Sequence, residues 1–356
     1  MKFAIRVDSS PNIGMGHLMR CLALANGLKR RGFEVYFICR DFQGNGTDRI
    51  KKNDFNLELL SIKGLELNGT WLGVPYRDDA QDTIDVISEN PADWLVVDHY
   101  DIDENWEAEL RSKFPHLKIM VIDDLVDRRH DCDFLLDQTY GRTEEGYKQL
   151  VPPNAKFCLG TEYALLRSDF KELRKQVLTP EKSSNDICHI LVTLGGGDYF
   201  KPIQVIAKAL KKIANDHQFS VTVITGNTPE ELLKDFKSLP QKVEYISFSP
   251  DISNEMVKAD FVIGAGGGTS WERCCLALPT IVLTIADNQI EAVKILSDNK
   301  AIIPVSISVD EIAMATKRLI VDDQFRLEMS KSASKLCDGN GVERVVDKIL
   351  EKCTVV

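Results

Sequence analysis

A histidine beside two closely spaced glycines is the first feature of this chain that could do chemistry. Gly14, Gly16 and His17 stand between an apolar segment at 2–7 and a run of apolar residues at helical spacing that ends before Gly32. This pattern predicts a strand, a turn and a helix, with the histidine at the start of the helix. Free N–H groups there attract anions, and the helix dipole favours the neutral, basic form of the imidazole. The alternative is a pair of packing glycines beside a solvated histidine.

A second glycine-rich turn, at residues 264–268, follows a predicted buried strand and leads into a helix that carries Glu272. The backbone N–H groups of residues 267–270 can converge on phosphate oxygens, and Glu272 can accept hydrogen bonds from both hydroxyls of a ribose. The spacing differs from that of the dinucleotide-binding fingerprint. The sequence therefore indicates a binding site for a nucleoside diphosphate here, and the alternative is a purely structural glycine turn.

Polar residues also follow several predicted strands directly. They are Asp98-His99-Tyr100, Asp123-Asp124, Asp137-Gln138 and, in the second half of the chain, Asn288-Gln289. Consecutive parallel strands place these positions at one edge of a sheet, where ligands bind. Amide side chains suit the hydroxyl and amide groups of an uncharged sugar. The alternatives are helix capping by the aspartates and a buried tyrosine whose hydroxyl is already hydrogen-bonded.

The elements that position these residues form two α/β series, each with a glycine-rich loop. The first series has predicted strands at 2–7, 34–39, 57–60, 94–98, 118–122 and 134–136, with helices at 81–88 and 105–113. The second has strands at 187–194, 220–225, 243–247, 261–264, 280–283 and 301–304, with helices at 201–214, 230–236 and 290–298. A polar stretch at 174–186 containing Pro180 predicts the boundary. We therefore expect two doubly wound domains, at 1–175 and 186–340, and a terminal helix at 341–356 that returns to the first.

Composition narrows the class of protein. The 356 residues include 44% hydrophobic and 28% charged residues, as is ordinary for a globular enzyme. A net charge of -10 argues against a nucleic-acid partner. The nine cysteines form no Cys-x-x-Cys pair, so we expect no structural metal and a reducing, cytoplasmic environment. We expect no membrane span and no cofactor, and the sequence is compatible with a monomer but leaves the oligomeric state open.

Taken together, these motifs resemble the nucleotide-sugar enzymes of the glycosyltransferase B (GT-B) architecture, in which two Rossmann-like domains face one another across a cleft. Residues 264–279 resemble the donor-binding segment of the UDP-N-acetylglucosamine transferases of peptidoglycan synthesis. The first half resembles the UDP-sugar hydrolases of pseudaminic acid biosynthesis, through residues 6–10, 13–17, 20, 98–100, 123–124 and 163–167. One departure is the run of three glycines at 266–268, where some relatives have serines.

The resemblance implies roles for individual residues. His17, Tyr100 and Asn288 are the predicted catalytic residues, with His17 as the base. The predicted substrate-binding residues, from the motifs and the resemblance together, are Asp8, Gly14, Gly16, Arg20, Gly195, Gly196, Phe248, Ser249, Ile252, Gly267, Gly268, Thr269, Ser270, Glu272 and Gln289.

The implied activity is hydrolysis of a UDP-linked diacetamido-trideoxyhexose at its anomeric carbon, with inversion and without metal. Two alternatives remain at this stage. A GT-B glycosyltransferase would pass the sugar to a hydroxyl or lipid acceptor and needs an apolar acceptor surface near Gly14. A non-catalytic UDP-sugar-binding protein would keep Glu272 and the glycines but has no use for His17.

Overall fold

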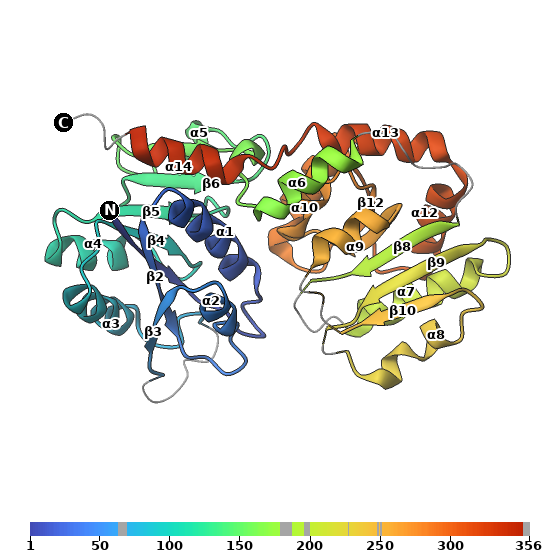
Figure 1. Ribbon diagram of the computed structural model, residues 1–356, viewed down its shortest axis with the longest axis horizontal. Coiled ribbons are helices and arrows are strands. Elements are labelled where there is room, and N and C mark those ends of the chain that lie inside the picture. Colours follow the sequence, from blue (N-terminus) through green and yellow to red (C-terminus); the bar gives the residue numbers. More distant parts are fainter. Residues whose placement is uncertain are drawn as a thin grey trace. The chain divides into compact units, whose positions relative to one another are not determined.

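Two compact units make up the chain in the computed structural model (Figure 1). The structure describes residues 1–62, 70–178, 187–195, 200–226, 228–247, 249 and 251–351, and of Asn288 the backbone only. Unit 1 comprises Met1–Leu165 together with the residues from Asn340 on, and unit 2 comprises Leu166–Gly339. Unit 1 is thus built from two separate stretches of sequence.

Unit 1 contains a parallel sheet with the strand order β3-β2-β1-β4-β5-β6-β7. The strands are β1 (Lys2–Val7), β2 (Glu34–Arg40), β3 (Asn56–Leu60), β4 (Trp94–Asp98), β5 (Lys118–Ile122), β6 (Phe134–Asp137) and β7 (Lys156–Leu159). The order of the strands reverses between β1 and β4, which pair directly with Val7 opposite Asp98. The carboxyl ends of these two strands therefore form the topological switch point, where doubly wound sheets bind ligands.

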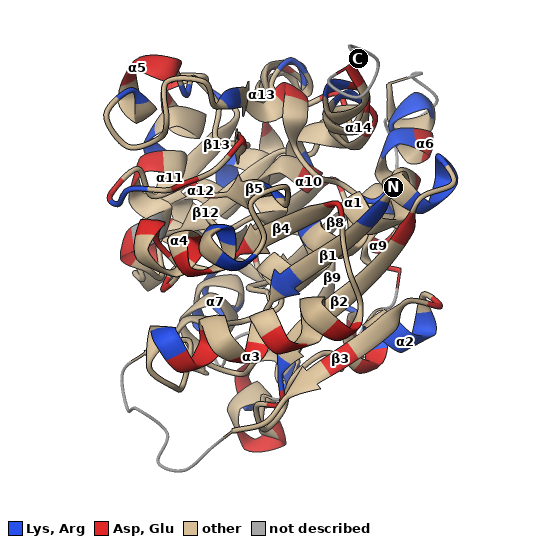
Figure 2. Ribbon diagram, turned by 90° about the vertical axis from the view of Figure 1, so that its left-hand side faces the viewer, with Lys and Arg blue, Asp and Glu red and all other residues tan. Residues whose placement is uncertain are grey.

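The helices of unit 1 cover its sheet. They are α1 (Gly16–Arg30), α2 (Asp48–Lys52), α3 (Tyr76–Glu89), α4 (Glu104–Lys113), α5 (Glu144–Tyr147), a 3₁₀ turn η1 (Thr161–Tyr163) and α14 (Gly341–Glu351). In Figure 2, charged residues colour much of the ribbon of α3 and α4, whereas β4 and β5 are mostly uncharged. Strands buried on both faces require apolar residues at successive positions, which explains the continuous apolar runs in the sequence.

Helix α14 packs directly against α1, although more than 300 residues separate them in the sequence. A Cβ atom on Gly27 would lie 2.3 Å from Val342 Cγ1, so glycine lets the two helices approach closely. A Cβ atom on Gly341 would lie 2.2 Å from the Ala164 carbonyl oxygen. Val342, Val345 and Val346 of α14 join the same apolar core as Leu18 and the other buried residues of α1.

Unit 2 repeats this plan with the strand order β10-β9-β8-β11-β12-β13, again fully parallel. Its strands are β8 (Cys188–Thr193), β9 (Phe219–Ile224), β10 (Val243–Ile246), β11 (Phe261–Ala265), β12 (Thr280–Leu283) and β13 (Ile302–Val305). The switch point lies between β8 and β11, which pair directly. The glycine-rich turn that follows β11 is therefore at the ligand-binding edge of this sheet.

The helices of unit 2 include four that the sequence analysis did not predict, namely α6, α9, α12 and α13. The full set is α6 (Ser168–Val177), α7 (Phe200–Ile213), η2 (Glu230–Leu233), α8 (Lys234–Lys237), α9 (Ile252–Lys258), α10 (Thr269–Cys275), η3 (Asp287–Gln289), α11 (Ile290–Asp298), α12 (Val309–Val321) and α13 (Asp323–Ser334). The prediction of one helix at 230–236 is wrong, because a 3₁₀ turn there precedes a single α-helical turn. This segment buries only Leu233 and Phe236. The 3₁₀ turn and the α-helical turn together place both side chains in the core of unit 2.

The change from unit 1 to unit 2 comes after Leu165, earlier than the polar stretch that suggested a boundary at 174–186. Helix α6 belongs to unit 2, where it contacts α9 and α10. Arg174 of α6 donates to the carbonyl oxygens of Cys275 (2.6 Å), Cys337 (3.0 Å) and Ser334 (2.7 Å). The polar composition suggested the position of a domain boundary, whereas these hydrogen bonds show that α6 belongs to unit 2.

Candidate functional site

His17 begins the first turn of α1, directly after the loop that leaves β1. Gly14 has a φ of +81°, and its N–H donates to the Ser10 carbonyl oxygen at 2.8 Å, which closes a tight turn. Ser10 Oγ also accepts from the Ile13 N–H at 3.1 Å. A positive φ favours glycine, so Gly14 sets the direction in which the chain enters α1. This turn places His17 beside the end of β4.

Asp98, the last residue of β4, fixes the imidazole of His17. Its Oδ1 lies 2.6 Å from His17 Nδ1. Because an ionised carboxylate only accepts hydrogen bonds, Nδ1 carries the proton and Nε2 of the neutral ring carries the lone pair. No described residue pairs with Nε2, which leaves it available as a base.

Arg20 lies one turn along α1 from His17 and holds two carboxylates. Its guanidinium donates to both oxygens of Asp98 at 2.7 Å and to Asp124 Oδ2 at 3.0 Å. Burial alone would raise the pKa of Asp98, but the charges and hydrogen bonds of Arg20 and His17 together outweigh burial and hold this pKa well below its usual range. Asp98 therefore remains an acceptor for His17 throughout the physiological pH range.

The hydroxyl of Tyr100 donates to Asp124 Oδ1 at 2.6 Å. Burial and the neighbouring Asp124 carboxylate raise the pKa of Tyr100 well above its usual range, so the phenol keeps its proton. Because that proton is committed to Asp124, the phenol oxygen can only accept from a ligand. The ring of Tyr100 stands edge-on to that of His17, with 4.7 Å between the centroids.

Trp71 completes this cluster and was not among the residues predicted from the sequence. Its ring centroid lies 4.9 Å from that of Tyr100 and 5.6 Å from that of His17. It stands in a loop without helical or strand periodicity, so no pattern of spacing could have found it. The unit 1 site thus combines one free imidazole nitrogen, one hydrogen-bond-accepting phenol and an aromatic surface.

Asp8, a predicted substrate ligand, lies deep in unit 1. It accepts from Arg6 at 2.6 and 2.8 Å and from the Arg40 N–H at 2.7 Å. His99 Nε2 lies 3.3 Å from Asp8 Oδ2, and His99 Nδ1 accepts from the Asp101 N–H at 3.1 Å. With these partners, Asp8 ties β1 to the loop after β4, and its contact with substrate remains a prediction.

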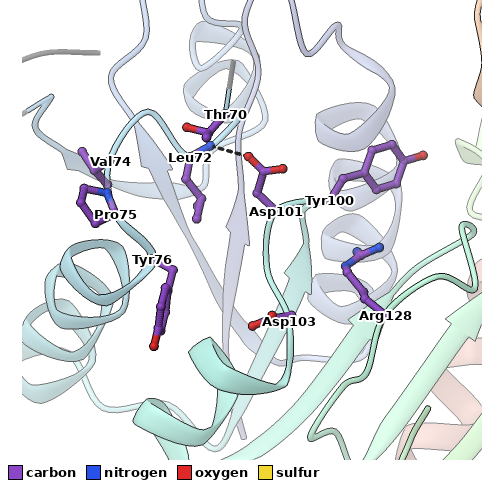
Figure 3. Close-up of a pocket in the computed structure, with 9 residues that line it drawn as sticks. All are labelled: Thr70, Leu72, Val74, Pro75, Tyr76, Tyr100, Asp101, Asp103 and Arg128. Carbon is purple, nitrogen blue, oxygen red and sulfur yellow. Dashed lines mark hydrogen bonds between the residues drawn. The ribbon is translucent and has the colours of Figure 1, made fainter. Parts of the chain in front are cut away.

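Tyr100 also lines a pocket of about 380 Å³ (Figure 3). Leu72, Val74 and Pro75 supply apolar lining, and Asp101 projects between them and Tyr100. Asp101 accepts from the backbone N–H groups of Trp71 and Leu72, the latter at 3.3 Å. The loop that carries Trp71 is therefore fastened to the same segment that carries Tyr100.

In unit 2, Glu272 lies in the first turn of α10 and is partly buried. Burial raises the pKa of Glu272 to about 7, against the opposing influence of the Arg167 and Arg273 charges. Hydrogen-bond donors of a bound ligand would favour the ionised form of this carboxylate. Gly267, Gly268, Thr269 and Ser270 precede it in the same turn.

Arg273 braces this glycine turn from within. Its Nη2 donates to the Ala265 carbonyl oxygen at 2.7 Å and to Ser270 Oγ at 2.9 Å. A Cβ atom on Gly264 would lie 2.5 Å from Arg273 Nη1, so glycine makes room for the guanidinium. Burial lowers the pKa of Arg273 to about 10, and the group stays charged at neutral pH.

The other predicted residues of unit 2 are spread over three segments. Gln289 is buried, and its Oε1 accepts from the N–H groups of Gly266 and Ile285, each at 3.2 Å, so it joins the turn after β11 to the turn after β12. Gly195 follows β8 with a φ of +90°. Ile252 begins α9, and Ser249 precedes this helix and accepts from the Asp251 N–H at 3.3 Å. Gly196 and Phe248 lie outside the described residues, as does the side chain of Asn288.

Within the described residues, no group of three or more His, Cys, Asp or Glu side chains is arranged to hold a metal ion. No helix in the described part of the chain is long and apolar enough to cross a membrane.

Comparison with known proteins relates residues 189–345 to the glycosyltransferase family 28 C-terminal domain. The chain is 27% identical over 263 residues to the UDP-2,4-diacetamido-2,4,6-trideoxy-beta-L-altropyranose hydrolase of Campylobacter jejuni, covering 74% of this chain and 84% of that protein. It is 22% identical over 365 residues to the spore coat polysaccharide biosynthesis protein SpsG of Bacillus subtilis, covering 97% and 96% of the two chains. An uncharacterized protein of Methanocaldococcus jannaschii is 26% identical over 290 residues, which are 80% of this chain and 55% of that protein.

The fold has a close counterpart among solved structures. The crystal structure of MurG from Acinetobacter baumannii matches with a TM-score of 0.70 at 15% identity, over 99% of this chain and all of that one. The predicted fold class, two α/β units with parallel sheets as in GT-B enzymes, is confirmed. The resemblance to the altropyranose hydrolase family stated from the motifs is likewise confirmed at the level of sequence similarity.

Proposed function

We propose that this chain, which resembles the nucleotide-sugar enzymes of the GT-B fold, hydrolyses a UDP-linked diacetamido-trideoxyhexose. The products would be UDP and a free amino sugar for nonulosonic acid biosynthesis of the pseudaminic acid type. Sequence similarity to the Campylobacter hydrolase supports this substrate class, and the match to the family 28 domain supports an enzyme that uses nucleotide sugars.

The observation that carries the proposal is the contact between His17 and Asp98. Asp98 Oδ1 lies 2.6 Å from His17 Nδ1, and no described residue pairs with Nε2, which carries the lone pair in the neutral imidazole. In the proposed reaction, Nε2 takes a proton from water while the water oxygen forms a bond to the anomeric carbon. The bond from that carbon to the phosphate oxygen breaks, and UDP leaves with the electron pair. Attack from the face opposite UDP inverts the anomeric configuration.

We assign UDP to unit 2. Glu272 would accept from the ribose hydroxyls, and the backbone of residues 267–270 would bind the diphosphate, with Gly195 and Gly196 at the neighbouring strand end. Phe248, Ser249 and Ile252 would contact uracil. Because bound diphosphate is a good leaving group, no protein acid, metal or cofactor is required in this mechanism.

We assign the sugar to the His17 cluster of unit 1. Tyr100 would accept a hydrogen bond from an N–H or O–H of the sugar, and Asn288 would bind an acetamido group. Arg20 holds Asp98 and Asp124, so it positions both His17 and Tyr100, and its contact with substrate remains a prediction. Gly14 and Gly16 leave space around His17, since a Cβ atom at either position would meet nothing within 4 Å.

One alternative is a glycosyltransferase that uses a UDP-N-acetyl amino sugar donor. The match to a glycosyltransferase family over residues 189–345 favours it, because that region carries the predicted UDP site. The two functions differ in whether water or another hydroxyl attacks the anomeric carbon.

Turnover in ¹⁸O-labelled water separates these functions. Hydrolysis at the anomeric carbon predicts release of UDP without any added acceptor, with one ¹⁸O in the sugar and none in UDP. Proton NMR during the first turnovers should show the inverted anomer. Release of UDP only after addition of a hydroxyl acceptor would establish the transferase, and ¹⁸O in UDP would refute attack at carbon.

A further inference from the structure

Trp71 has a position that no role assigned so far explains. Its backbone N–H donates to Asp101, and the Leu72 N–H donates to the same carboxylate oxygen at 3.3 Å. Leu72 and Val74 are buried, and Leu72 joins the apolar core of unit 1. The loop is thus anchored at Trp71 and at the residues that follow it, and Trp71 itself remains partly exposed.

The indole faces the two side chains that the proposed reaction uses. It lies 4.9 Å from the Tyr100 ring at an interplanar angle of 33°, and it stands at 88° to the His17 ring at 5.6 Å. Its N–H donates to none of the described residues. A partly exposed aromatic ring held next to a base is suited to packing against the apolar part of a ligand.

A sugar whose anomeric carbon is within reach of a water on His17 Nε2 has the Trp71 and Tyr100 rings close by, because both rings contact the His17 ring. The apolar parts of a diacetamido-trideoxyhexose are its C6 methyl group and the methyl groups of its acetamido substituents. An aromatic surface favours a methyl group over a hydroxymethyl group, because the hydroxyl would lose its hydrogen bonds to water there.

We propose that Trp71 is a specificity-determining residue that, with Tyr100, selects a 6-deoxy sugar over its 6-hydroxy counterpart. This inference rests on the proposed function, which places the sugar at His17. Discrimination of this kind in an apolar site is typically about 10- to 200-fold.

The test measures binding in a His17→Asn background, so that no ligand is consumed. Calorimetry gives the affinity for UDP, for UDP-2,4-diacetamido-2,4,6-trideoxy-β-L-altropyranose and for the same compound with a hydroxyl at C6. Trp71→Ala should reduce the preference for the 6-deoxy sugar about tenfold. Trp71→Leu removes the ring but keeps apolar bulk, so it should reduce the preference by a smaller factor, whereas Trp71→Phe should retain most of it.

Tyr76→Ala is the matched control. Tyr76 lies across the pocket from Tyr100 (Figure 3) and makes no ring contact with His17 among the described residues. This variant should leave the preference unchanged, and none of the variants should alter the affinity for UDP. The inference is overturned if Trp71→Ala keeps the preference, or if Tyr76→Ala lowers it equally. Absence of hydrolysis by the wild type would refute the proposed function instead, because the binding preference is measured without turnover.

Discussion

Replacing Glu272 by glutamine should stabilise the protein and weaken UDP binding at the same time. Burial raises the pKa of Glu272 from 4.5 to about 7. The folded state therefore binds this proton more tightly than the unfolded state does. Stability from this group is fully present below pH 4.5 and falls as the pH rises to 7, because the buried carboxyl must then ionise.

The size of the effect follows from the two pKa values. Each tenfold difference in proton affinity corresponds to about 1.4 kcal/mol, so ionisation of Glu272 costs the folded state about 3 kcal/mol above pH 7. Glutamine cannot ionise and avoids this cost. We expect Glu272→Gln to raise the free energy of unfolding by up to about 3 kcal/mol at pH 8 and by about 1 kcal/mol at pH 5.

Urea unfolding at several pH values measures this gain, with Glu244→Gln as the control. Glu244 is an exposed carboxylate of β10 in the same unit, and its replacement removes the same charge without relieving burial. Calorimetry with UDP should show a loss of about 1.5–3 kcal/mol for Glu272→Gln, as expected for a charged acceptor of hydrogen bonds. A gain in stability that does not vary with pH would refute the argument from burial, and unchanged UDP affinity would refute the ribose assignment.

Three further predictions concern unit 1. His17→Asn should lower turnover about 10²–10⁴-fold in a UDP-release assay while calorimetry shows UDP affinity unchanged, and a parallel loss of UDP affinity would contradict the assignment of His17 as the base. Asp98→Asn should lower turnover and also cost about 3–5 kcal/mol of stability in urea unfolding, because Arg20 loses its buried counter-charge; a variant with full turnover would show that the orientation of His17 does not depend on Asp98. Gly341→Ala should destabilise the protein by about 1–3 kcal/mol in urea unfolding, because its Cβ would meet backbone atoms of Ala164. Gly146→Ala, whose Cβ would lie 3.6 Å from its nearest neighbour, should leave stability unchanged, and equal unfolding midpoints of the two variants would show that α14 can shift.

Much of the fold follows from local sequence patterns. The apolar runs of β1, β4 and β11, each ending in polar or glycine residues, predict the strands and the ligand-binding edges. The sequence analysis predicts neither α12 nor α13. Helix α12 does bury Ile312, Thr316 and Leu319 at helical spacing, whereas α13 buries only Met329 and Ala333. The sequence analysis also misses β7, an edge strand in which only Cys158 is fully buried, so its sequence lacks the continuous apolar run of an inner strand.

The site was less accessible from the sequence because its contacts are long-range. Asp98 could be placed at the sheet edge, but its hydrogen bond to His17, 81 residues away, depends on β4 pairing with β1. Asp8 looked like a ligand-binding residue by its position, and only the structure shows Arg6 and Arg40 around it. Trp71 gave no signal at all, since its placement comes from Asp101 across two loops.

The packing of α14 on α1 also bears on how the protein is made. A ribosome completes α1 and all seven strands of the first sheet, and then the whole of unit 2, before it adds Val342 and the residues that cover α1. The apolar face of α1 around Gly27 therefore stays exposed while unit 2 is synthesised. Unit 2 can complete its fold before unit 1 does, although most of unit 1 precedes it in the sequence. A nascent chain arrested before Gly341 should hold a folded unit 2 beside an incomplete unit 1 that depends on chaperones, and the final helix converts it into the native protein.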